Sequence, residues 1–283
     1  MTSFGQFFGF EEDHRIPEGW LSWQHLTYTS ILVIAVILIG LRLGMQYKDR
    51  TDREKKKPMR IASIVMIVAE ISKVILISVR SRDPWTFRSM LPLFLCSIIL
   101  FTLPIAAFGK GRISSAAINF TFVFDMLCCI AGTYLAANYY QNSPIFSFDP
   151  MVSNVTHCIA GFSAVYIGSS GLAKREPGDH WLMSAILGIF EATALTVNQL
   201  QIESDYESNY MFFTDPGDTP FSLCMDLVGE IQPLYTAFVG ALYFGYLVLF
   251  LIIWKKDDSS FSRHFPRPYV ILLFSRCSDT ALQ

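Results

Sequence analysis

The sequence carries little charge for its length. Of its 283 residues, 16% are Asp, Glu, Lys or Arg and 52% are hydrophobic, whereas soluble domains are usually about a quarter charged. The six cysteines include no CxxC pair, and the stretch 203–226 contains no Lys or Arg. These absences argue against a soluble protein, a disulfide framework and nucleic acid as a partner.

Long apolar runs are present instead, each close to the roughly 20 residues that a helix needs to cross a bilayer. They predict an all-α, polytopic membrane bundle of about seven transmembrane helices. Short connections favour one domain over 22–254, between an extracytoplasmic segment at 1–21 and a cytoplasmic tail at 255–283. The predicted spans are Ser22–Gln46, Arg60–Val79, Met90–Phe108, Ile113–Ala137, Met151–Leu172, Trp181–Ile202 and Gly229–Trp254.

The basic residues outside these spans gather on one side. Sixteen lie on the side of the first connection and the C-terminal tail, and four on the other. Seven belong to the first connection alone: Lys48, Arg50, Arg53, Lys55, Lys56, Lys57 and Arg60. Because basic loops stay in the cytoplasm, this bias predicts an outside N-terminus and a cytoplasmic C-terminus.

A thiol and an imidazole are predicted to lie at one depth in this bundle. Cys96 is six residues after Met90, and His157 is six residues after Met151. At 1.5 Å per residue, each lies about 9 Å inside the outer face. An adjacent His can activate a Cys for nucleophilic acyl chemistry. Taken alone, however, each has a structural reading: Cys as an apolar filler, His as an interhelical hydrogen-bonding group.

Other helices bring polar groups close to the same layer. By the same rise, Lys73 lies about 9 Å deep, Glu70 about 14 Å and Asn198 about 6 Å, and His25 is within a turn of that face. We expect these residues to support a site or bind substrate, with Asn198 or Lys73 as oxyanion donor. Two structural alternatives stay open: a Glu70–Lys73 ion pair, three residues apart on one helix face, and Asn198 as a link between helices.

Asp125 and Glu191 are predicted to lie deeper in the membrane. Burying a charged side chain there is costly. We therefore expect each of these carboxyl groups to have a hydrogen-bonding partner.

Several motifs resemble those of the bacterial YwaF-like membrane proteins. They are the LPLFLC run Leu91–Cys96, the segment Val197–Leu200, the NYM-aromatic run Asn209–Phe212, and the approach to the last helix around Ser222–Gly229. Two departures stand out: Phe94 occupies a position where the bacterial proteins often carry His, and Glu230 one where Pro is common. The resemblance covers roughly 22–254.

That family is similar to an animal membrane acyltransferase that remodels ether phospholipids without acyl-CoA. The resemblance implies a thioester on Cys96, assisted by His157, and a bacterial plasma membrane location. Phospholipid and lysophospholipid would be the substrates, with no soluble cofactor and no metal. Asn209 and Tyr210 would close the external mouth, or form an ordinary turn with an interfacial aromatic.

Two other functions stay open from the sequence. A hydrolase would use the same Cys and His with water as the acceptor. A lipid or small-molecule transporter would need neither, although the broken helices and inverted repeats typical of transporters are not evident. A zinc hydrolase is disfavoured, because only His25 and His157 lie at the expected depth and a catalytic zinc usually takes three protein ligands.

Overall fold

The computed structural model describes residues 4–10, 16–83, 85–201, 208–217 and 219–260, and every regular element within them is helical. The long helices are α2 (Trp23–Tyr47), α3 (Asp52–Ser81), α5 (Gly111–Tyr134), α7 (Phe148–Ser170), α8 (Asp179–Gln201) and α10 (Gln232–Ser260). Shorter helices are α1 (Phe4–Phe8), α4 (Ile99–Phe108), α6 (Ala137–Asn142) and α9 (Ser222–Leu227). Single 3-10 turns are η1 (Thr86–Met90), η2 (Leu95–Ser97) and η3 (Tyr210–Phe212).

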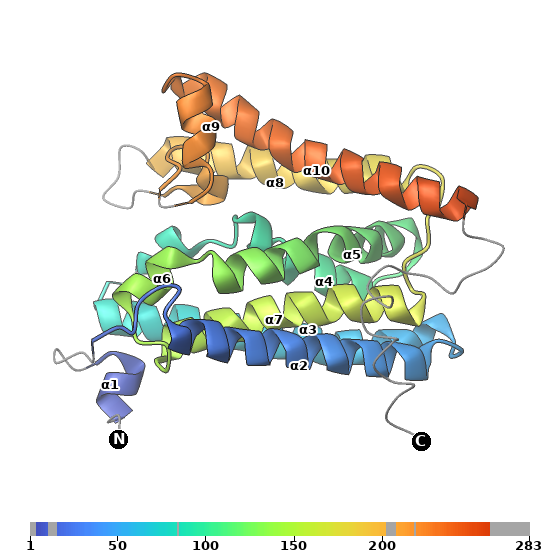
Figure 1. Cartoon of the computed structure of the whole chain (residues 1–283), viewed down its shortest axis with the longest axis horizontal. Coiled ribbons are helices and arrows are strands. Elements are labelled where there is room, and N and C mark those ends of the chain that lie inside the picture. The colour runs from blue at the N-terminus through green and yellow to red at the C-terminus, as the bar shows by residue number, and fades with distance from the viewer. Residues whose placement is uncertain (1–3, 11–15, 84, 202–207, 218, 261–283) are drawn as a thin grey trace.

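The long helices run side by side along one axis, and α5 lies between two groups (Figure 1). One group holds α2, α3, α4 and α7, and the other holds α8 and α10. The apolar core is divided in the same way: one cluster joins α3, α4, α5 and α7, and another joins α5 to α8 and α10. Helices α1, α6 and α9 lie together at one end of the bundle.

Small residues let the helices around α7 approach closely. A Cβ added to Gly44 would lie 1.8 Å from Ser169 Oγ, and one added to Gly161 would lie 2.6 Å from Cys129 Sγ. Gly40 and Gly44 are four residues apart on α2, as in other close contacts between membrane helices. Since a methyl group does not fit at Gly44 or Gly161, α2 and α5 pack almost directly on α7.

Among the described residues, five helices are long and apolar enough to cross a membrane: α2, α3, α5, α8 and α10. The prediction of a helical, multi-pass membrane protein is therefore confirmed. Helix α7 has 23 residues but carries more polar groups and is largely buried. The count of seven spans, the orientation and the division into segments remain predictions, and residues 1–3, 11–15 and 261–283 of the two terminal segments lie outside the described part.

The predicted third span is not one continuous helix. Leu91 and Phe94 have extended backbone, Leu95–Ser97 form a 3-10 turn, and α4 covers only 10 residues, about 15 Å of helix. Pro92 lacks an N–H group and disfavours helical backbone at the residue before it. Pro92 therefore precedes the helix, and the depth of about 9 Å for Cys96 no longer follows from helical rise and stays a prediction.

The last span also begins later than predicted. Gly229 and Glu230 have φ angles of 67° and 63°, a left-handed conformation that an α-helix does not accommodate. The chain therefore turns at these two residues, and α10 starts at Gln232 rather than Gly229.

Candidate functional site

The Cys96 thiol and the His157 imidazole lie close enough to interact with each other. Cys96 belongs to η2 and His157 to the third turn of α7, and both are partly buried. The structure thus brings together the two residues that the sequence paired. Thiol and imidazole in contact form the arrangement needed for proton transfer from a nucleophile to its base.

A backbone carbonyl fixes the orientation of the His157 ring. His157 Nδ1 lies 2.7 Å from the carbonyl oxygen of Ser153, one turn earlier on α7. A carbonyl only accepts, so Nδ1 carries the proton and Nε2 is left as the nitrogen that can take the proton from the thiol. The same anchoring of one imidazole nitrogen sets the role of the other in many sites.

His157 packs directly on Gly132 of α5. A Cβ at Gly132 would lie 1.9 Å from His157 Cδ2 and 2.0 Å from Nε2. Real atoms do not approach so closely, so any side chain at this position would push the imidazole away. Gly132 therefore leaves the space that the His157 ring occupies.

Cys96 is held differently, at the end of a segment without regular structure. Between η1 and η2 the chain forms one tight turn, in which the Leu93 N–H donates to the Leu91 carbonyl at 2.8 Å. Cys96 then lies in the first turn of the helical stretch Leu95–Phe108, where backbone N–H groups have no carbonyl partner within the helix. The Ser97 side chain lies close enough to the Cys96 thiol to interact with it.

Tyr210 connects this segment to the loop after α8. Its hydroxyl donates to the Arg88 carbonyl at 2.7 Å and accepts from the Leu91 N–H at 2.9 Å. Its ring contacts the Phe94 ring edge-on, with centroids 5.3 Å apart. The LPLFLC and NYM motifs, over 100 residues apart in the chain, are therefore in direct contact.

Asn198 fixes the backbone of Tyr210. Its side-chain NH₂ donates to the Tyr210 carbonyl at 3.0 Å, and its side-chain oxygen accepts from the Tyr210 N–H at 2.9 Å and from Ser208 Oγ at 3.1 Å. Asn209 Oδ1 accepts from the N–H groups of Thr214 and Asp215. Both Asn side chains thus shape the loop, and we assign Asn198 to support of Tyr210 rather than to an oxyanion.

The loop they shape is strained. Met211 and Phe212 have φ angles of 57° and 58°, and such residues cost about 1–3 kcal/mol each. Side chains of α10 compensate by donating to successive carbonyls: Tyr243 to Met211 at 3.1 Å and Tyr235 to Phe212 at 2.7 Å. Non-glycine residues persist in this conformation only where neighbouring groups hold them, often at functional sites.

Lys73 and Glu70 form an ion pair at 2.6 Å on α3, and both side chains are mostly buried. The structural pairing left open by the sequence is therefore present. Lys73 is also close enough to act electrostatically on the Cys96 sulfur. The pair consequently places a positive charge beside the thiol while Glu70 balances it.

The comparisons with known proteins now bear on this arrangement. The model of the TMEM164 family matches residues 20–255, which include α2, α3, α5, α7 and α8 in full, α10 as far as residue 255, and all of the residues described above in this subsection. The chain belongs to the TMEM164 family. No curated protein and no solved structure matches it.

His25 has a structural position in this TMEM164-family chain. Its Nε2 donates to the Thr133 carbonyl at 2.9 Å, its Nδ1 accepts from the Leu21 N–H at 3.2 Å, and its ring lies on Tyr140 with centroids 3.9 Å apart. Both nitrogens are thus used in joining the start of α2 to the end of α5. The sequence placed His25 in the layer but did not show that its ring was committed.

Two deeper carboxyl groups differ from expectation. We predicted partners for Asp125 and Glu191, but Asp125 Oδ2 and Glu191 Oε1 are buried without a hydrogen bond among the described residues. Their surroundings explain this: Asp125 lies among apolar core residues of α5, and Glu191 Oε2 faces Gly240 of α10, 3.4 Å from where a Cβ would lie. The prediction was wrong for these two atoms.

Three neighbours of the thiol were not predicted. Cys128 of α5, Tyr243 of α10 and Ser97 lie close enough to Cys96 to interact with it electrostatically. Ser97 could have been suggested by adjacency. Cys128 and Tyr243 carry no motif, and only the packing of α5 and α10 brings them to the site.

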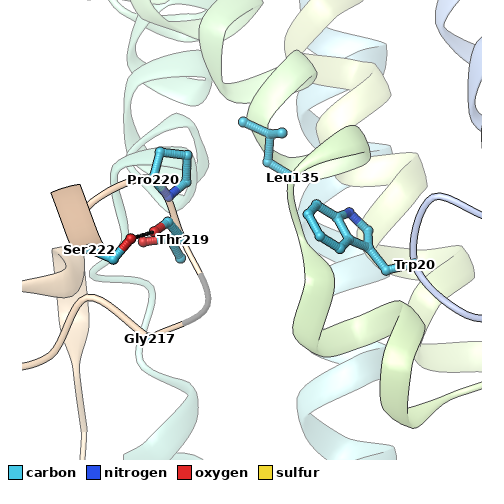
Figure 2. A pocket seen from close by; sticks show the side chains of 6 residues that line it. All are labelled: Trp20, Leu135, Gly217, Thr219, Pro220 and Ser222. Atoms are coloured by element: carbon cyan, nitrogen blue, oxygen red, sulfur yellow. Dashed lines mark hydrogen bonds between the residues drawn. The ribbon is translucent and has the colours of Figure 1, made fainter.

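A separate pocket opens where α5 ends and α9 begins (Figure 2). Its lining residues are Trp20, Leu135, Gly217, Thr219, Pro220 and Ser222. None of the predicted site residues lines it. The described residues also contain no group of three or more His, Cys, Asp or Glu that could hold a metal ion.

Proposed function

We propose that this protein is a membrane acyltransferase that moves a fatty acyl chain from a phospholipid to a lysophospholipid through a thioester on Cys96. The observation that carries the proposal is the proximity of Cys96 to His157, whose Nδ1 is anchored on the Ser153 carbonyl. It is supported by the resemblance of the LPLFLC and NYM motifs to YwaF-like proteins and their animal acyltransferase relative.

In the first half-reaction, His157 Nε2 takes the Cys96 proton and the sulfur attacks an ester carbonyl of the phospholipid. The carbon–sulfur bond forms, the carbon–oxygen bond breaks, and the imidazolium returns its proton to the departing lysophospholipid hydroxyl. In the second, His157 takes the proton of another lysophospholipid hydroxyl, which attacks the thioester. Sulfur leaves as thiolate and regains its proton from His157, so no cofactor is consumed.

The positive charge of Lys73 would stabilise the oxyanion of each tetrahedral intermediate. Preorganised donors and charges near a developing oxyanion are commonly a large part of catalysis. This role accords with the electrostatic contact between Lys73 and the Cys96 sulfur. It leaves Asn198 the supporting role described above.

We further propose seven membrane passes, an outside N-terminus and a bacterial plasma membrane. The sorting of basic residues supports the orientation. In Figure 1 the α2–α3, α4–α5 and α7–α8 connections, which hold many of these residues, lie at the end opposite α1. Reporter fusions in these connections and in the tail test it, with cytoplasmic readouts expected at each.

Intact-mass spectrometry tests the proposed chemistry. Protein in mild detergent is mixed with phospholipid, and wild type and Cys96→Ala are compared before and after neutral hydroxylamine. We expect a hydroxylamine-sensitive acyl adduct on wild type only. Absence of an adduct from every lipid class, in a folded protein, would contradict the proposal and favour a transporter.

Product analysis separates transferase from hydrolase. With the acyl adduct formed, lysophospholipid carrying a labelled headgroup is added. A labelled diacyl lipid is the expected product. Free fatty acid at equal rate with and without lysophospholipid would assign the same Cys and His to hydrolysis.

A further inference from the structure

The position of Cys96 depends on contacts made before it in the chain. From Leu91 to Leu93 the backbone makes no helical hydrogen bond, and Pro92 offers no N–H. Within this run the Leu91 N–H is held by Tyr210, and the Phe94 ring lies against the rings of Tyr210 and Phe212. Tyr210 therefore contacts both ends of the segment that delivers Cys96.

The hydroxyl and the ring of Tyr210 act on different parts of that segment. The hydroxyl joins two backbone groups, the Arg88 carbonyl and the Leu91 N–H, using its donor and acceptor capacity together. The ring packs on Phe94, two residues before Cys96. Removing the oxygen alone would release the backbone and leave the ring contact in place.

Tyr210 is itself firmly held. It is 1% exposed, and Asn198 of α8 hydrogen-bonds both its N–H and its carbonyl. The two carbonyls that follow accept from Tyr243 and Tyr235 of α10. The hydroxyl is thus a fixed point supported by α8 and α10, on the opposite side of α5 from α7.

We propose that Tyr210 is a positioning residue whose hydroxyl holds Cys96 within proton-transfer distance of His157. His157 needs no such support, because α7, Ser153 and Gly132 already fix its ring. The role of Tyr210 in acyl transfer rests on the proposed function, whereas its role in the Cys96–His157 geometry does not. It replaces the expectation that Tyr210 closes an external mouth over the substrate.

Alkylation of Cys96 by N-ethylmaleimide tests this without a lipid substrate. The rate at the Cys96 peptide is followed by mass spectrometry from neutral to alkaline pH in wild type, Tyr210→Phe, His157→Gln and the double variant. His157→Gln should be slowed at neutral pH and recover at alkaline pH, where thiolate forms without a base. Tyr210→Phe should show the same profile, about tenfold slower than wild type at neutral pH, because small displacements weaken such contacts strongly.

The double variant decides whether the hydroxyl acts through His157. If it does, adding Tyr210→Phe to His157→Gln should slow labelling no further, because one contact cannot be lost twice. Multiplying effects would overturn the proposal, as would wild-type labelling in Tyr210→Phe. Uniformly faster labelling at every pH would also overturn it, since that indicates a loosened fold.

Tyr166→Phe is the matched control. Tyr166 is fully buried on α7, and its hydroxyl donates to the Lys55 carbonyl at 2.7 Å, nine residues along the helix from His157. It should lose similar thermal stability but keep wild-type labelling. An equal labelling defect in both variants would reduce Tyr210 to an ordinary structural residue.

The acyl-adduct measurement separates the two proposals. An adduct on wild type with unchanged labelling in Tyr210→Phe keeps the proposed function and rejects the positioning role. If wild type forms no adduct but Tyr210→Phe still shows the labelling defect, the positioning role is kept and the proposed function is rejected.

Discussion

The two halves of the candidate site are built in opposite ways. His157 lies within a continuous 23-residue helix, and its ring is fixed by a local carbonyl and by direct packing on α5. Cys96 follows a non-helical run that distant side chains hold in place. The base is thus positioned by helix packing and the thiol by a few hydrogen bonds, so the two should respond to mutation differently.

We call His157 and its contacts with α7 and α5 the helix-packed half of the site. The largest effect is expected from Gly132→Ala, which disturbs this half. The added methyl would occupy the place of His157 Cδ2 and Nε2, so we expect loss of the acyl adduct by more than about a hundredfold. Gly188→Ala on α8 is the control, because its Cβ would meet only Phe244 at 3.6 Å. That change should leave the adduct intact and stabilise the helix slightly. An active Gly132→Ala enzyme would contradict the described packing.

We call Cys96 and the Tyr210 loop that positions it the loop-held half of the site. A smaller but still large effect is expected from Asn198→Ala, which removes the support of this loop. Two buried backbone groups of Tyr210 lose their partners, at a cost of about 2–4 kcal/mol. Thermal unfolding in detergent measures this loss, and thioester formation should fall with it. The control is Thr196→Ala on the same helix, where the hydroxyl donates to the Ala192 carbonyl one turn earlier; this change should affect neither stability nor thioester formation. Similar losses in the two variants would show that Asn198 has no special link to the loop.

The pair on α3 tests whether charge beside the thiol matters. We expect Lys73→Met to slow thioester formation roughly 10- to 100-fold, less than the roughly 100- to 1,000-fold seen when one oxyanion-hole donor is removed. Glu70→Gln keeps the positive charge and should slow it much less. If both variants lose stability equally and retain wild-type acylation, the ion pair is structural only, the alternative that the sequence left open.

Changing Phe94 should have a modest effect that sharpens the comparison with YwaF-like proteins. Phe94 packs on the rings of Tyr210 and Phe212, so Phe94→His, which keeps a ring, should change the acylation rate only a few-fold. Phe94→Ala removes the packing and should destabilise the protein by about 3 kcal/mol. A large gain from Phe94→His would indicate that a ring nitrogen at this position takes part in catalysis.

Hydropathy and charge were enough to predict a helical, multi-pass membrane protein, because both depend on composition along the chain. The Cys96–His157 contact was anticipated from equal depth. The helical rise assumed in that estimate holds for His157, which lies in a regular helix, but not for the segment before Cys96. Cys96 came to the same layer although its segment is not helical.

The contacts that position Cys96 and His157 could not be predicted from the sequence, for physical reasons. The need for glycine at position 132 can be recognised only once the structure shows that His157 of α7 packs against it. The Tyr210 contact with Leu91 depends on two left-handed residues, Met211 and Phe212, that nothing in their side chains favours. Local patterns predict local structure, whereas this loop is determined by side chains from α8 and α10.

The smallest effect is expected at the other end of the bundle, where α3 begins outside the apolar stretch. Thr51 and Glu54 form a reciprocal cap, and the hydrogen bond from the Thr51 hydroxyl lowers the pKa of the Glu54 carboxyl. A carboxyl with a lowered folded pKa stabilises the folded state above its unfolded pKa, roughly 4.3. That contribution is lost as pH falls through the folded pKa.

Thr51→Val should therefore reduce stability at neutral pH and flatten its decline below about pH 4, while leaving the acyl adduct unchanged. Thermal unfolding as a function of pH measures the change in stability, and intact-mass spectrometry measures the acyl adduct. Serine at position 51 should restore the cap, because its hydroxyl can make the same contacts. A change in acylation with Thr51→Val would mean that this end of α3 is coupled to Lys73, and that the helix-packed half of the site extends farther than His157 and α5.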